Sequence, residues 1–234
     1  MGLVSAMKYK NIEMAEFVSR PNRFVAHIII DGQEQTAHVP NTGRCKELLL
    51  PGARVVVSKS DNPKRKLAYS LISVYKGDML VNLDSQNPNR LVEEALCSGK
   101  LLGFSPQTVR REYTVGESRL DLMFDDPDHG KGLIEVKGCT LEIDGWAYFP
   151  DAPTLRGVKH LRELTAAKRE GWQCYVVFAI QMKGVAGFSP NRRTHEEFAE
   201  ALAEAQAAGV QVLAFDSVVL PEEVRLDEAV PVKL

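Results

Sequence analysis

The chain has 234 residues, of which 44% are hydrophobic and 26% charged, and its net charge is −2. This composition is ordinary for a soluble globular protein, and the length allows one large or two small domains. It excludes a largely disordered chain, and no apolar run approaches the roughly 20 residues that span a bilayer.

Residues 1–6 have neither the charged region nor the long apolar region of a secretory signal. The four cysteines, Cys45, Cys97, Cys139 and Cys174, are widely spaced and match no zinc-binding pattern. We therefore expect a cytoplasmic protein with reduced thiols, no membrane contact and no obligate protein partner.

Positive charge is concentrated in the N-terminal part. Residues 1–83 contain 12 Lys and Arg against 7 Asp and Glu, whereas residues 84–234 contain 17 against 24. A basic segment joined to an acidic one favours contact of the first with a polyanion. We predict two domains with this boundary, of which the first binds nucleic acid.

The N-terminal domain is predicted to consist of short strands at residues 10–18, 23–30, 33–39, 54–59, 67–75 and 79–83. Turn-forming residues separate them, and the pair Asp31-Gly32 is a hairpin signal. Five or six strands in so short a stretch fit a small barrel better than a sandwich, so we predict an OB-like β-barrel.

Two loops of this barrel carry polar and basic groups. Asn41 and Arg44 lie in the first, beside a glycine, and the second presents the consecutive cations Lys64, Arg65 and Lys66. Cations and side-chain donors of this kind suit the binding of a phosphate backbone. The alternative is a solvated turn in the second loop and a tight bend in the first, and the sequence leaves both interpretations open.

A linker rich in Asn, Asp, Ser and Pro is predicted at residues 82–88, followed by a helix at 89–97 that Gly99 ends. Glu94 lies at the edge of the apolar stripe of this helix. A carboxylate in that position is a candidate outer metal ligand, and an exposed helix acid is the alternative.

Three strands are predicted next, at residues 108–115, 117–124 and 133–137. Strand alternation in the second puts Leu120, Leu122 and Phe124 on one face and Asp121 on the other. In the third, Glu135 and Lys137 share a face for the same reason.

If the second and third strands form a hairpin, Asp121, Glu135 and Lys137 converge on one polar patch. Two carboxylates suit Mg²⁺ or Mn²⁺, which prefer oxygen ligands. A lysine beside them can orient the attacking water and neutralise charge on a phosphoryl group, as hydrolysis of a phosphodiester requires. The composition predicts about two chance occurrences of Asp/Glu-x-Lys, so the alternative is a solvated strand face without chemical function.

A further helix is predicted from the spacing of Val158, and Thr154, Arg156, Lys159 and His160 cluster at its start. Backbone N–H groups and the helix dipole favour anions there, so these side chains are candidates to hold a scissile phosphate. Alternatively, Thr154 is a helix cap and His160 a partly buried helix residue.

The remaining chain alternates strand and helix. Residues 172–180 form an apolar strand, a capping box at 194–197 opens a helix that ends at Gly209, and residues 210–215 form a last strand. Residues 221–234 are expected on the surface. This succession predicts an α/β sandwich around a mixed central sheet, so the whole chain belongs to the α+β or α/β class.

The order of a helix acid, Glu94, a strand acid, Asp121, and Glu135-x-Lys137 fourteen residues later resembles the PD-(D/E)xK core of restriction-endonuclease-like proteins. From about residue 10 onward, the chain also resembles the sugar fermentation stimulation protein A family. The residues that carry this resemblance are 38–43, 62–66, 89–90, 94–95, 118–121, 135–137, 140–141, 149–152, 154, 156–157 and 159–161.

The resemblance implies an N-terminal OB-like domain, a C-terminal restriction-endonuclease-like domain and binding of DNA without sequence preference. It also implies a regulatory function in sugar, especially maltose, metabolism and a nuclease activity on DNA and RNA. Asp121 and Glu135 match the family's metal-binding acids, Lys137 its active-site lysine and Glu94 its helix acid. His195 stands where the family has an acid, and we assign it no function.

We therefore expect a DNA-binding protein whose C-terminal domain hydrolyses phosphodiester bonds of DNA and/or RNA with Mg²⁺ or Mn²⁺. One alternative is a non-catalytic DNA-binding regulatory factor in sugar (maltose) metabolism. The other is a protein that binds a small molecule or a protein partner and has no affinity for nucleic acid.

Overall fold

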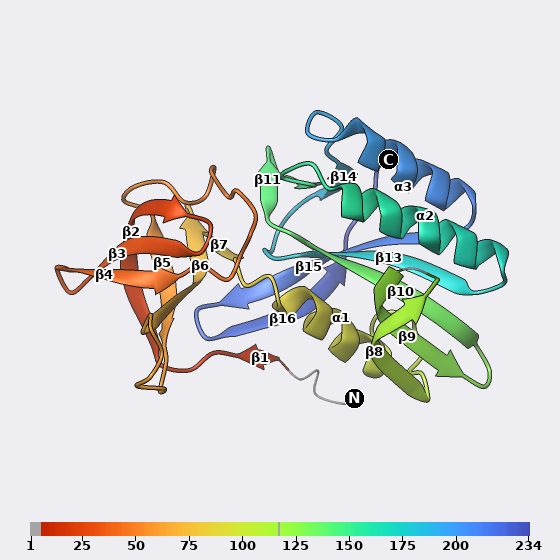
Figure 1. Ribbon diagram of the computed structural model, residues 1–234, viewed down its shortest axis with the longest axis horizontal. Coiled ribbons are helices and arrows are strands. Elements are labelled where there is room, and N and C mark those ends of the chain that lie inside the picture. The colour runs from red at the N-terminus through yellow and green to blue at the C-terminus, as the bar shows by residue number, and fades with distance from the viewer. Residues whose placement is uncertain (1–5, 117) are drawn as a thin grey trace.

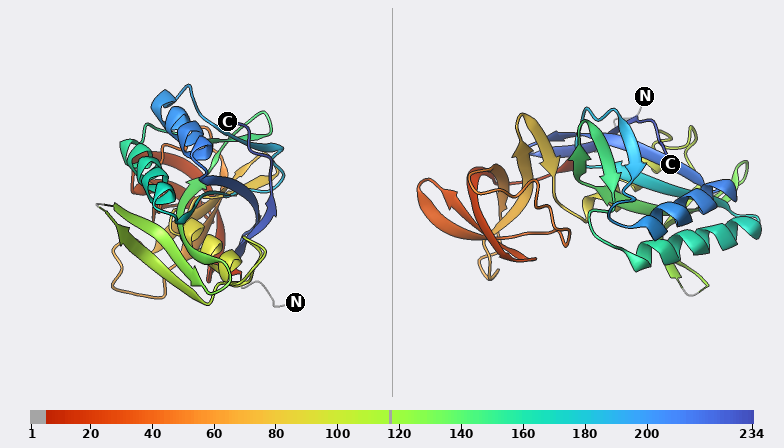
Figure 2. Two further views of the ribbon diagram at one scale, coloured as in Figure 1. Left: turned by 90° about the vertical axis from the view of Figure 1, so that its right-hand side faces the viewer. Right: turned by 90° about the horizontal axis from the view of Figure 1, so that it is seen from above.

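The computed structural model describes residues 6–116 and 118–234. Residues 1–5 of the N-terminal segment and Glu117 of the predicted second strand lie outside the described residues. Figure 1 shows a β-barrel from the first part of the chain beside a larger sheet with its helices. The view from above in Figure 2 shows the two bodies end to end in an elongated molecule.

The barrel consists of β2 (Ile12–Asn22), β3 (Val25–Ile30), β4 (Gln33–His38), β5 (Arg54–Lys59), β6 (Tyr69–Lys76) and β7 (Met79–Asn82). The strands pair in the order β4-β3-β2-β5-β6-β7, and an additional pairing of β4 with β6 closes five of them into a barrel. Alternate residues such as Phe17, Ile28 and Leu71 fill its interior. The predicted OB-like barrel is confirmed.

The second body is built on a seven-stranded mixed sheet of β1 (Met7–Lys8), β8 (Thr108–Val115), β9 (Ser118–Asp126), β10 (Gly130–Cys139), β13 (Gln173–Ile180), β15 (Gln211–Leu220) and β16 (Glu223–Ala229). Their order is β1-β16-β15-β13-β10-β9-β8, and β13 is parallel to both of its neighbours. The predicted mixed α/β sheet is confirmed.

Three helices cover this sheet. The helix α1 (Asn87–Cys97) packs on one face with Leu122 and Ile134, and α2 (Leu155–Arg169) and α3 (Glu196–Ala207) pack on the other face with Leu133 and Val176. None of the helices in the described part of the chain is long and apolar enough to cross a bilayer.

A small third sheet was not predicted. It consists of β11 (Leu141–Ile143), β12 (Trp146–Phe149) and β14 (Gly187–Pro190). Lys76 on the barrel donates to the backbone oxygen of Glu142 in β11 at 2.8 Å. The chain that follows β12, residues 150–154, also contacts the barrel, because Oδ2 of Asp151 accepts the Arg44 N–H.

The junction between the two bodies is hydrogen-bonded and largely buried. The Asn82 N–H donates to the Gln181 carbonyl at 2.8 Å, and Nε2 of Gln181 donates to the Asn82 carbonyl at 2.7 Å. The Tyr9 hydroxyl accepts from Nδ2 of Asn82 at 3.0 Å and contacts Asn87. The expected linker is therefore shorter than predicted, because Asn82 ends β7 and Asn87 begins α1, and their polar side chains are paired inside the junction.

The alternation predicted for residues 120–124 holds only in part. Leu122 and Phe124 pack toward α1, but Leu120 belongs to the core on the α2 face. Opposite Asp121, Glu112 of β8 has a φ of +53°, and the β8–β9 ladder skips this pair. The irregularity interrupts the regular pleat at this point.

Two predictions for the C-terminal part are wrong. Residues 221–234 are not simply a surface segment, because β16 pairs with β15 and β1 and buries Val224 and Leu226. The capping box is also absent: His195 is the N-cap of α3 without a side-chain cap bond, and the Thr194 N–H donates to Asn191 instead.

Candidate metal and nucleic-acid site

The hairpin predicted between the acidic strands is present. The strands β9 and β10 pair antiparallel, and their last backbone pair is Leu122 with Ile134. Just beyond it, Oδ2 of Asp121 accepts the Val136 N–H at 2.8 Å. The side chain of Asp121 thus continues the pairing where the backbone ladder ends, and it points toward β10 beside Glu135.

Glu135 is the most buried acid of the site, with 2% of its surface exposed. Its Oε1 accepts from Nζ of Lys137 at 2.5 Å and contacts Nδ1 of His160. Its Oε2 is buried and has no hydrogen-bond partner among the described residues. Burial opposes ionisation of this carboxyl, but the contacts with His160 and Lys137 outweigh it and hold the pKa of Glu135 below its ordinary value.

Asp121 has a different environment. Its Oδ1 accepts from Nδ2 of Asn89, in the first turn of α1, at 2.8 Å. Burial and the nearby charge of Glu135 raise the pKa of Asp121 above its ordinary value. The two carboxyls therefore repel each other when both are ionised, which is the condition that a bound cation relieves. Asn89 was part of the family resemblance, but its contact with Asp121 was not predicted.

His160 connects the site to the start of α2. It is 5% exposed, and its Nε2 accepts from Nε of Arg156 at 3.4 Å while Nδ1 faces Glu135. An imidazole with its proton on Nδ1 satisfies both contacts, because Nδ1 then donates to the carboxylate and Nε2 accepts. Arg156 and His160 thus lie together beside Glu135.

The other two residues of the predicted phosphate cluster have local partners. Oγ1 of Thr154, the N-cap of α2, accepts the Gly157 N–H at 3.0 Å, which is the capping function considered as its alternative. Lys159 is exposed on the first turns of α2 and forms an ion pair with Glu163 at 3.8 Å.

Glu94 is not joined to Asp121 or Glu135 by any hydrogen bond among the described residues. Its Oε1 accepts from Nε of Arg90 at 2.9 Å, and its Oε2 is buried without a described partner. Glu94 thus lies on the helix that also supplies Asn89, one to two turns further on.

Asn41 and Arg44 lie in a loop that a third residue, Arg20, holds in place. Arg20 donates to the backbone carbonyls of Asn41, Gly43 and Arg44 at 2.6 to 3.0 Å, and Oδ1 of Asn41 accepts the Gly43 N–H at 2.6 Å. Across the gap to the second body, Oδ2 of Asp151 accepts the Arg44 N–H at 2.9 Å. Asn41 therefore builds the bend, and the side chain of Arg44 remains exposed.

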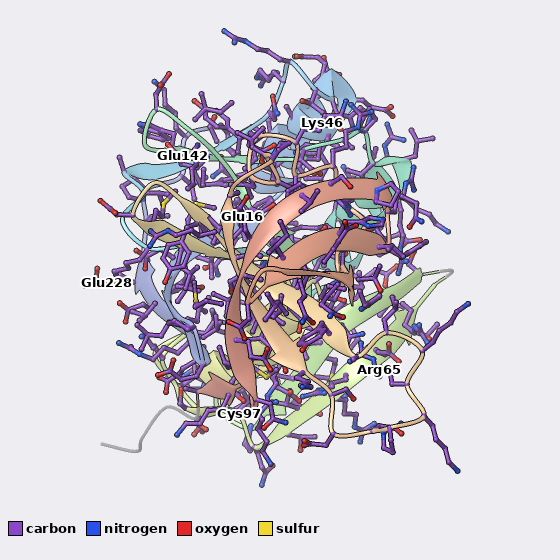
Figure 3. The ribbon with its side chains drawn as sticks, turned by 90° about the vertical axis from the view of Figure 1, so that its left-hand side faces the viewer. Glu16, Lys46, Arg65, Cys97, Glu142 and Glu228 are labelled. Atoms are coloured by element: carbon purple, nitrogen blue, oxygen red, sulfur yellow. The ribbon has the colours of Figure 1, made fainter. Side chains whose placement is uncertain are left out.

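Lys64, Arg65 and Lys66 form an exposed loop elsewhere on the barrel. Nη2 of Arg65 donates to Oγ of Ser70 at 2.8 Å. Figure 3 shows Lys46, which follows the Arg44 loop, and Arg65 well apart on the barrel end. The two predicted phosphate-binding loops therefore do not form one surface.

A cleft of about 650 Å³ lies between the barrel and the α/β domain. Its lining includes Asn41, Arg44 and Thr154, which were predicted as site residues, and none of the three consecutive cations. Gly138, which directly follows Lys137, lines it as well. The cleft therefore extends to the residue next to the candidate metal site.

Sequence reasoning missed several further cleft residues, among them Arg20, Arg23, Lys46 and Gln181. These four come from β2, the turn after it, a barrel loop and the residue that follows β13. The basic charge of residues 1–83 was the one signal that pointed to the first three, since their neighbourhood arises only when the two bodies meet.

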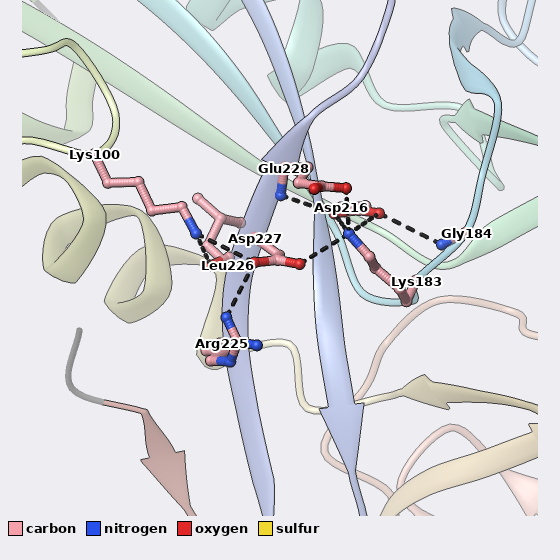
Figure 4. A network of polar contacts seen from close by, with 8 residues as sticks. All are labelled: Lys100, Lys183, Gly184, Asp216, Arg225, Leu226, Asp227 and Glu228. Carbon is pink, nitrogen blue, oxygen red and sulfur yellow. Dashed lines mark hydrogen bonds and ion pairs between the residues drawn. The ribbon is translucent and has the colours of Figure 1, made fainter. Parts of the chain in front are cut away.

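A separate acidic group lies on β15 and β16 (Figure 4). Ligand atoms of Asp216, Asp227 and Glu228 all lie within 4.8 Å of one another. Nζ of Lys183 contacts all three carboxylates at 2.8 to 3.0 Å. Burial opposes the charge of Lys183, yet these contacts raise its pKa above its ordinary value. An ammonium group already supplies the cation here, so we assign this cluster a structural function.

The architecture defines a two-domain protein in which an OB barrel precedes a mixed α/β domain. The chain belongs to the SfsA family: the family model "Sugar fermentation stimulation protein RE domain" matches residues 86–223, and the model "SfsA N-terminal OB domain" matches residues 18–83.

Relatives match over almost the whole chain. Sugar fermentation stimulation protein homologs of Clostridium beijerinckii and Ruminiclostridium cellulolyticum are each 49% identical, over 97% of this chain and 100% of the relative. The solved structure of Pyrococcus furiosus SfsA in complex with Ca²⁺ is similar with a TM-score of 0.86 and 28% identity, covering 97% of this chain and 98% of that chain.

Proposed function

We propose that this protein is a divalent-metal-dependent nuclease that hydrolyses phosphodiester bonds of DNA and/or RNA in a C-terminal domain, residues 84–234. The barrel, residues 1–83, binds the nucleic acid. The observation that carries the proposal is the pair Asp121 and Glu135 on adjoining strands with Lys137 at 2.5 Å from Glu135. The proposed location is the cytoplasm.

The donor set fits Mg²⁺ or Mn²⁺. Oε2 of Glu135 is a buried carboxylate oxygen without a described partner, and each oxygen of Asp121 keeps a lone pair beyond the one N–H that it accepts. Both acids offer the hard oxygens that these ions prefer. The Pyrococcus furiosus relative, in complex with Ca²⁺, supports a cation-binding function in the family, because Ca²⁺ has the same preference for oxygen.

When bound, such an ion supplies positive charge to the phosphoryl oxygens and makes a water nucleophilic near neutral pH. The ammonium of Lys137 orients the attacking water and offsets charge that develops on the phosphoryl group. His160 fixes the orientation of Glu135 by contacting Oε1, and Arg156 braces the phosphate from the start of α2. Glu94, between one and two helix turns beyond Asn89, is the outer acid that assists the two metal-binding acids.

Nucleic-acid contacts outside the metal site are proposed for two surfaces. Asn41, Arg44, Thr154 and Lys159 border the cleft and the start of α2, where backbone N–H groups favour a phosphate. Lys64, Arg65 and Lys66 provide a separate exposed surface for phosphates.

A non-catalytic DNA-binding regulator of sugar metabolism is the second candidate. One observation favours it: Lys137 and His160 both contact Oε1 of Glu135, so the charge of this acid is balanced without a metal ion. The relatives' shared name, sugar fermentation stimulation protein, is consistent with such a regulatory function.

The two candidates are separated by incubating the purified protein with mixed DNA and RNA in the presence of Mn²⁺, Mg²⁺ or a chelator. We expect cleavage that the chelator abolishes and that Glu135→Gln and Lys137→Met reduce by roughly 100-fold or more, with binding nearly unchanged. Glu112→Gln, at an exposed acid of β8, is the matched control and retains activity.

Titration calorimetry with Mn²⁺ provides a readout that does not depend on activity. We expect a binding site in the wild type and in Glu112→Gln, and none in Asp121→Asn or Glu135→Gln. Nucleic-acid binding without any metal-dependent cleavage selects the regulator, and cleavage that survives in both Glu135→Gln and Lys137→Met refutes the proposed site.

A further inference from the structure

The cleft between the two bodies has features that the proposed nuclease chemistry does not explain. Its barrel wall contains Arg23, Arg44 and Lys46, and its opposite wall is formed by residues 149–154 before α2. Gln181, from the end of β13, lines it too. The inference below rests on the proposed function, because it concerns which nucleic acid reaches Glu135 and Lys137.

The cations of the barrel wall are available to a ligand. Arg23, Arg44 and Lys46 are exposed, and none of their side chains makes a hydrogen bond or ion pair among the described residues. By contrast, Arg20 is committed to the backbone carbonyls of the loop, and Asp151 accepts the Arg44 N–H. The backbone of the wall is therefore held by hydrogen bonds, and its exposed side chains are positively charged, which suits a phosphate backbone.

One exposed apolar residue follows each wall directly in the chain, although neither belongs to the cleft lining itself. Phe24 directly follows Arg23 and is 55% exposed, and Leu155 directly follows Thr154 and is 73% exposed. An aromatic ring next to cations is the arrangement on which the bases of an unpaired strand stack, and an aliphatic side chain can pack on a base face in the same way. In a duplex these base faces are stacked on one another and unavailable.

Gln181 adds a requirement on the ligand. It is 1% exposed, its Nε2 is bonded to the Asn82 carbonyl, and its Oε1 is buried without a described partner. That oxygen needs an N–H or O–H donor, which a phosphate lacks and a base or ribose provides. The cleft therefore combines sites for anions, for apolar ring faces and for a donor, and a nucleotide carries all three.

The volume of the cleft also fits a nucleotide. About 650 Å³ is within the range of pockets that enclose one small organic ligand, roughly 300 to 1,000 Å³, so it has room for a nucleotide or two and not for a double helix. We propose that this cleft binds a single-stranded polynucleotide, with phosphates on Arg23, Arg44 and Lys46 and bases against Phe24 and Leu155, and leads it past Gly138 to Glu135 and Lys137.

The test measures nucleic-acid binding under conditions that prevent cleavage. Fluorescence anisotropy in the presence of a chelator compares labelled single-stranded DNA, single-stranded RNA and duplex DNA of about 16 nucleotides per strand, the upper size of an OB binding site. We expect single strands to bind at least about 10-fold more tightly than the duplex. Phe24→Ala should weaken single-strand binding roughly 5- to 100-fold, as loss of one stacking contact does.

Matched variants locate the effect. Met14→Ala removes another exposed apolar side chain of the barrel, 48% exposed, that has no cleft-lining residue next to it in the chain, and this variant should bind like the wild type. Arg44→Ala should lower the slope of log affinity against log salt by about one, while its backbone N–H still bonds to Asp151. Circular dichroism checks that each variant is folded, which we expect because the three side chains are exposed.

Each outcome decides. Equal affinity for duplex and single strand, an effect of Phe24→Ala no larger than that of Met14→Ala, or no binding of any of the three ligands overturns the inference. Selective single-strand binding by a protein that never cleaves refutes the proposed nuclease and leaves the cleft assignment intact. Metal-dependent cleavage by a protein that binds the duplex more tightly than single strands supports the proposed nuclease and overturns the cleft assignment. The DNA and RNA arms show which single strand the cleft prefers.

Discussion

His160 on α2 contacts Glu135 on β10 through Nδ1 and Oε1, although 25 residues separate them in the chain. Both residues are at most 5% exposed. His160→Ala should lower the free energy of unfolding by about 2 to 3 kcal/mol, because it removes a buried hydrogen bond to a charged group. His160→Asn keeps a donor near the position of Nδ1 and should lose less. Urea unfolding measures both, and an alanine variant as stable as the wild type contradicts the assignment.

Gly43 lies where the barrel loop approaches the second body. A Cβ there would be 2.7 Å from Oδ2 of Asp151 and 2.8 Å from Oδ1 of Asn41. Gly43→Ala should therefore displace the loop, cost about 1 to 3 kcal/mol and weaken nucleic-acid binding.

Gly77→Ala is the control for this variant. Gly77 lies in an open barrel turn at φ +62° with no neighbouring atom within 4 Å of an added Cβ. Backbone strain should cost it about 1 to 2 kcal/mol without affecting nucleic-acid binding. Equal losses of affinity in both variants would show that stability, and not loop position, is responsible.

Tyr9 stabilises the junction between the two bodies. Its hydroxyl accepts from Nδ2 of Asn82 and contacts Nδ2 of Asn87. Burial and the charge of Asp84 raise the pKa of Tyr9 well above its ordinary value, so the phenol remains protonated at neutral pH. Tyr9→Phe should cost about 1 to 3 kcal/mol, because it removes the hydroxyl that connects the Asn82 and Asn87 amides to Asp84, although each amide nitrogen keeps another acceptor.

The matched control is Tyr113→Phe, whose hydroxyl makes no hydrogen bond among the described residues and should be nearly neutral. Thermal or urea unfolding of the two variants checks this difference. If Tyr9→Phe is as stable as Tyr113→Phe, the junction does not depend on the phenol.

Lys183 links the three carboxylates of Figure 4, and Lys183→Met should lower stability by about 1 to 3 kcal/mol near neutral pH, because Asp216, 3% exposed, loses its cation. The hydrogen bond from Lys183 lowers the pKa of Asp227. The stabilisation by the Lys183–Asp227 ion pair is therefore present above the pKa of Asp in the unfolded chain, about 3.9. It is lost as the pH falls through the lower pKa that Asp227 has in the folded protein.

The pH dependence of the stability of Lys183→Met follows from the lowered pKa of Asp227. The difference in unfolding free energy between the wild type and Lys183→Met should be constant between about pH 5 and 8 and should shrink below about pH 4. Urea unfolding across this range measures it, with Lys183→Arg as a variant that keeps the charge. A difference that grows on acidification would contradict the ion-pair explanation.

Much of the fold follows from local patterns. Alternating strands and turn residues such as Asp31-Gly32 predicted the barrel, and the period-2 placement of Glu135 and Lys137 predicted their shared face. The β16 strand was missed although Val224 and Leu226 alternate with charged residues, because the segment is short and acidic overall and was therefore interpreted as surface chain. The predicted capping box at Thr194 does not form, because the Thr194 N–H already donates to the Asn191 carbonyl.

The sequence by itself determined that a barrel precedes an α/β domain, and it predicted that Asp121 and Glu135 lie on adjoining strands, because alternation and turn chemistry are properties of neighbouring residues. Only the tertiary structure decided that Asn89 and His160 surround those acids, that Lys64, Arg65 and Lys66 lie away from the cleft, and that Arg23 and Gln181 line it. These relationships depend on how α1, α2 and the barrel pack against the sheet, and such long-range contacts leave no periodic trace in the chain.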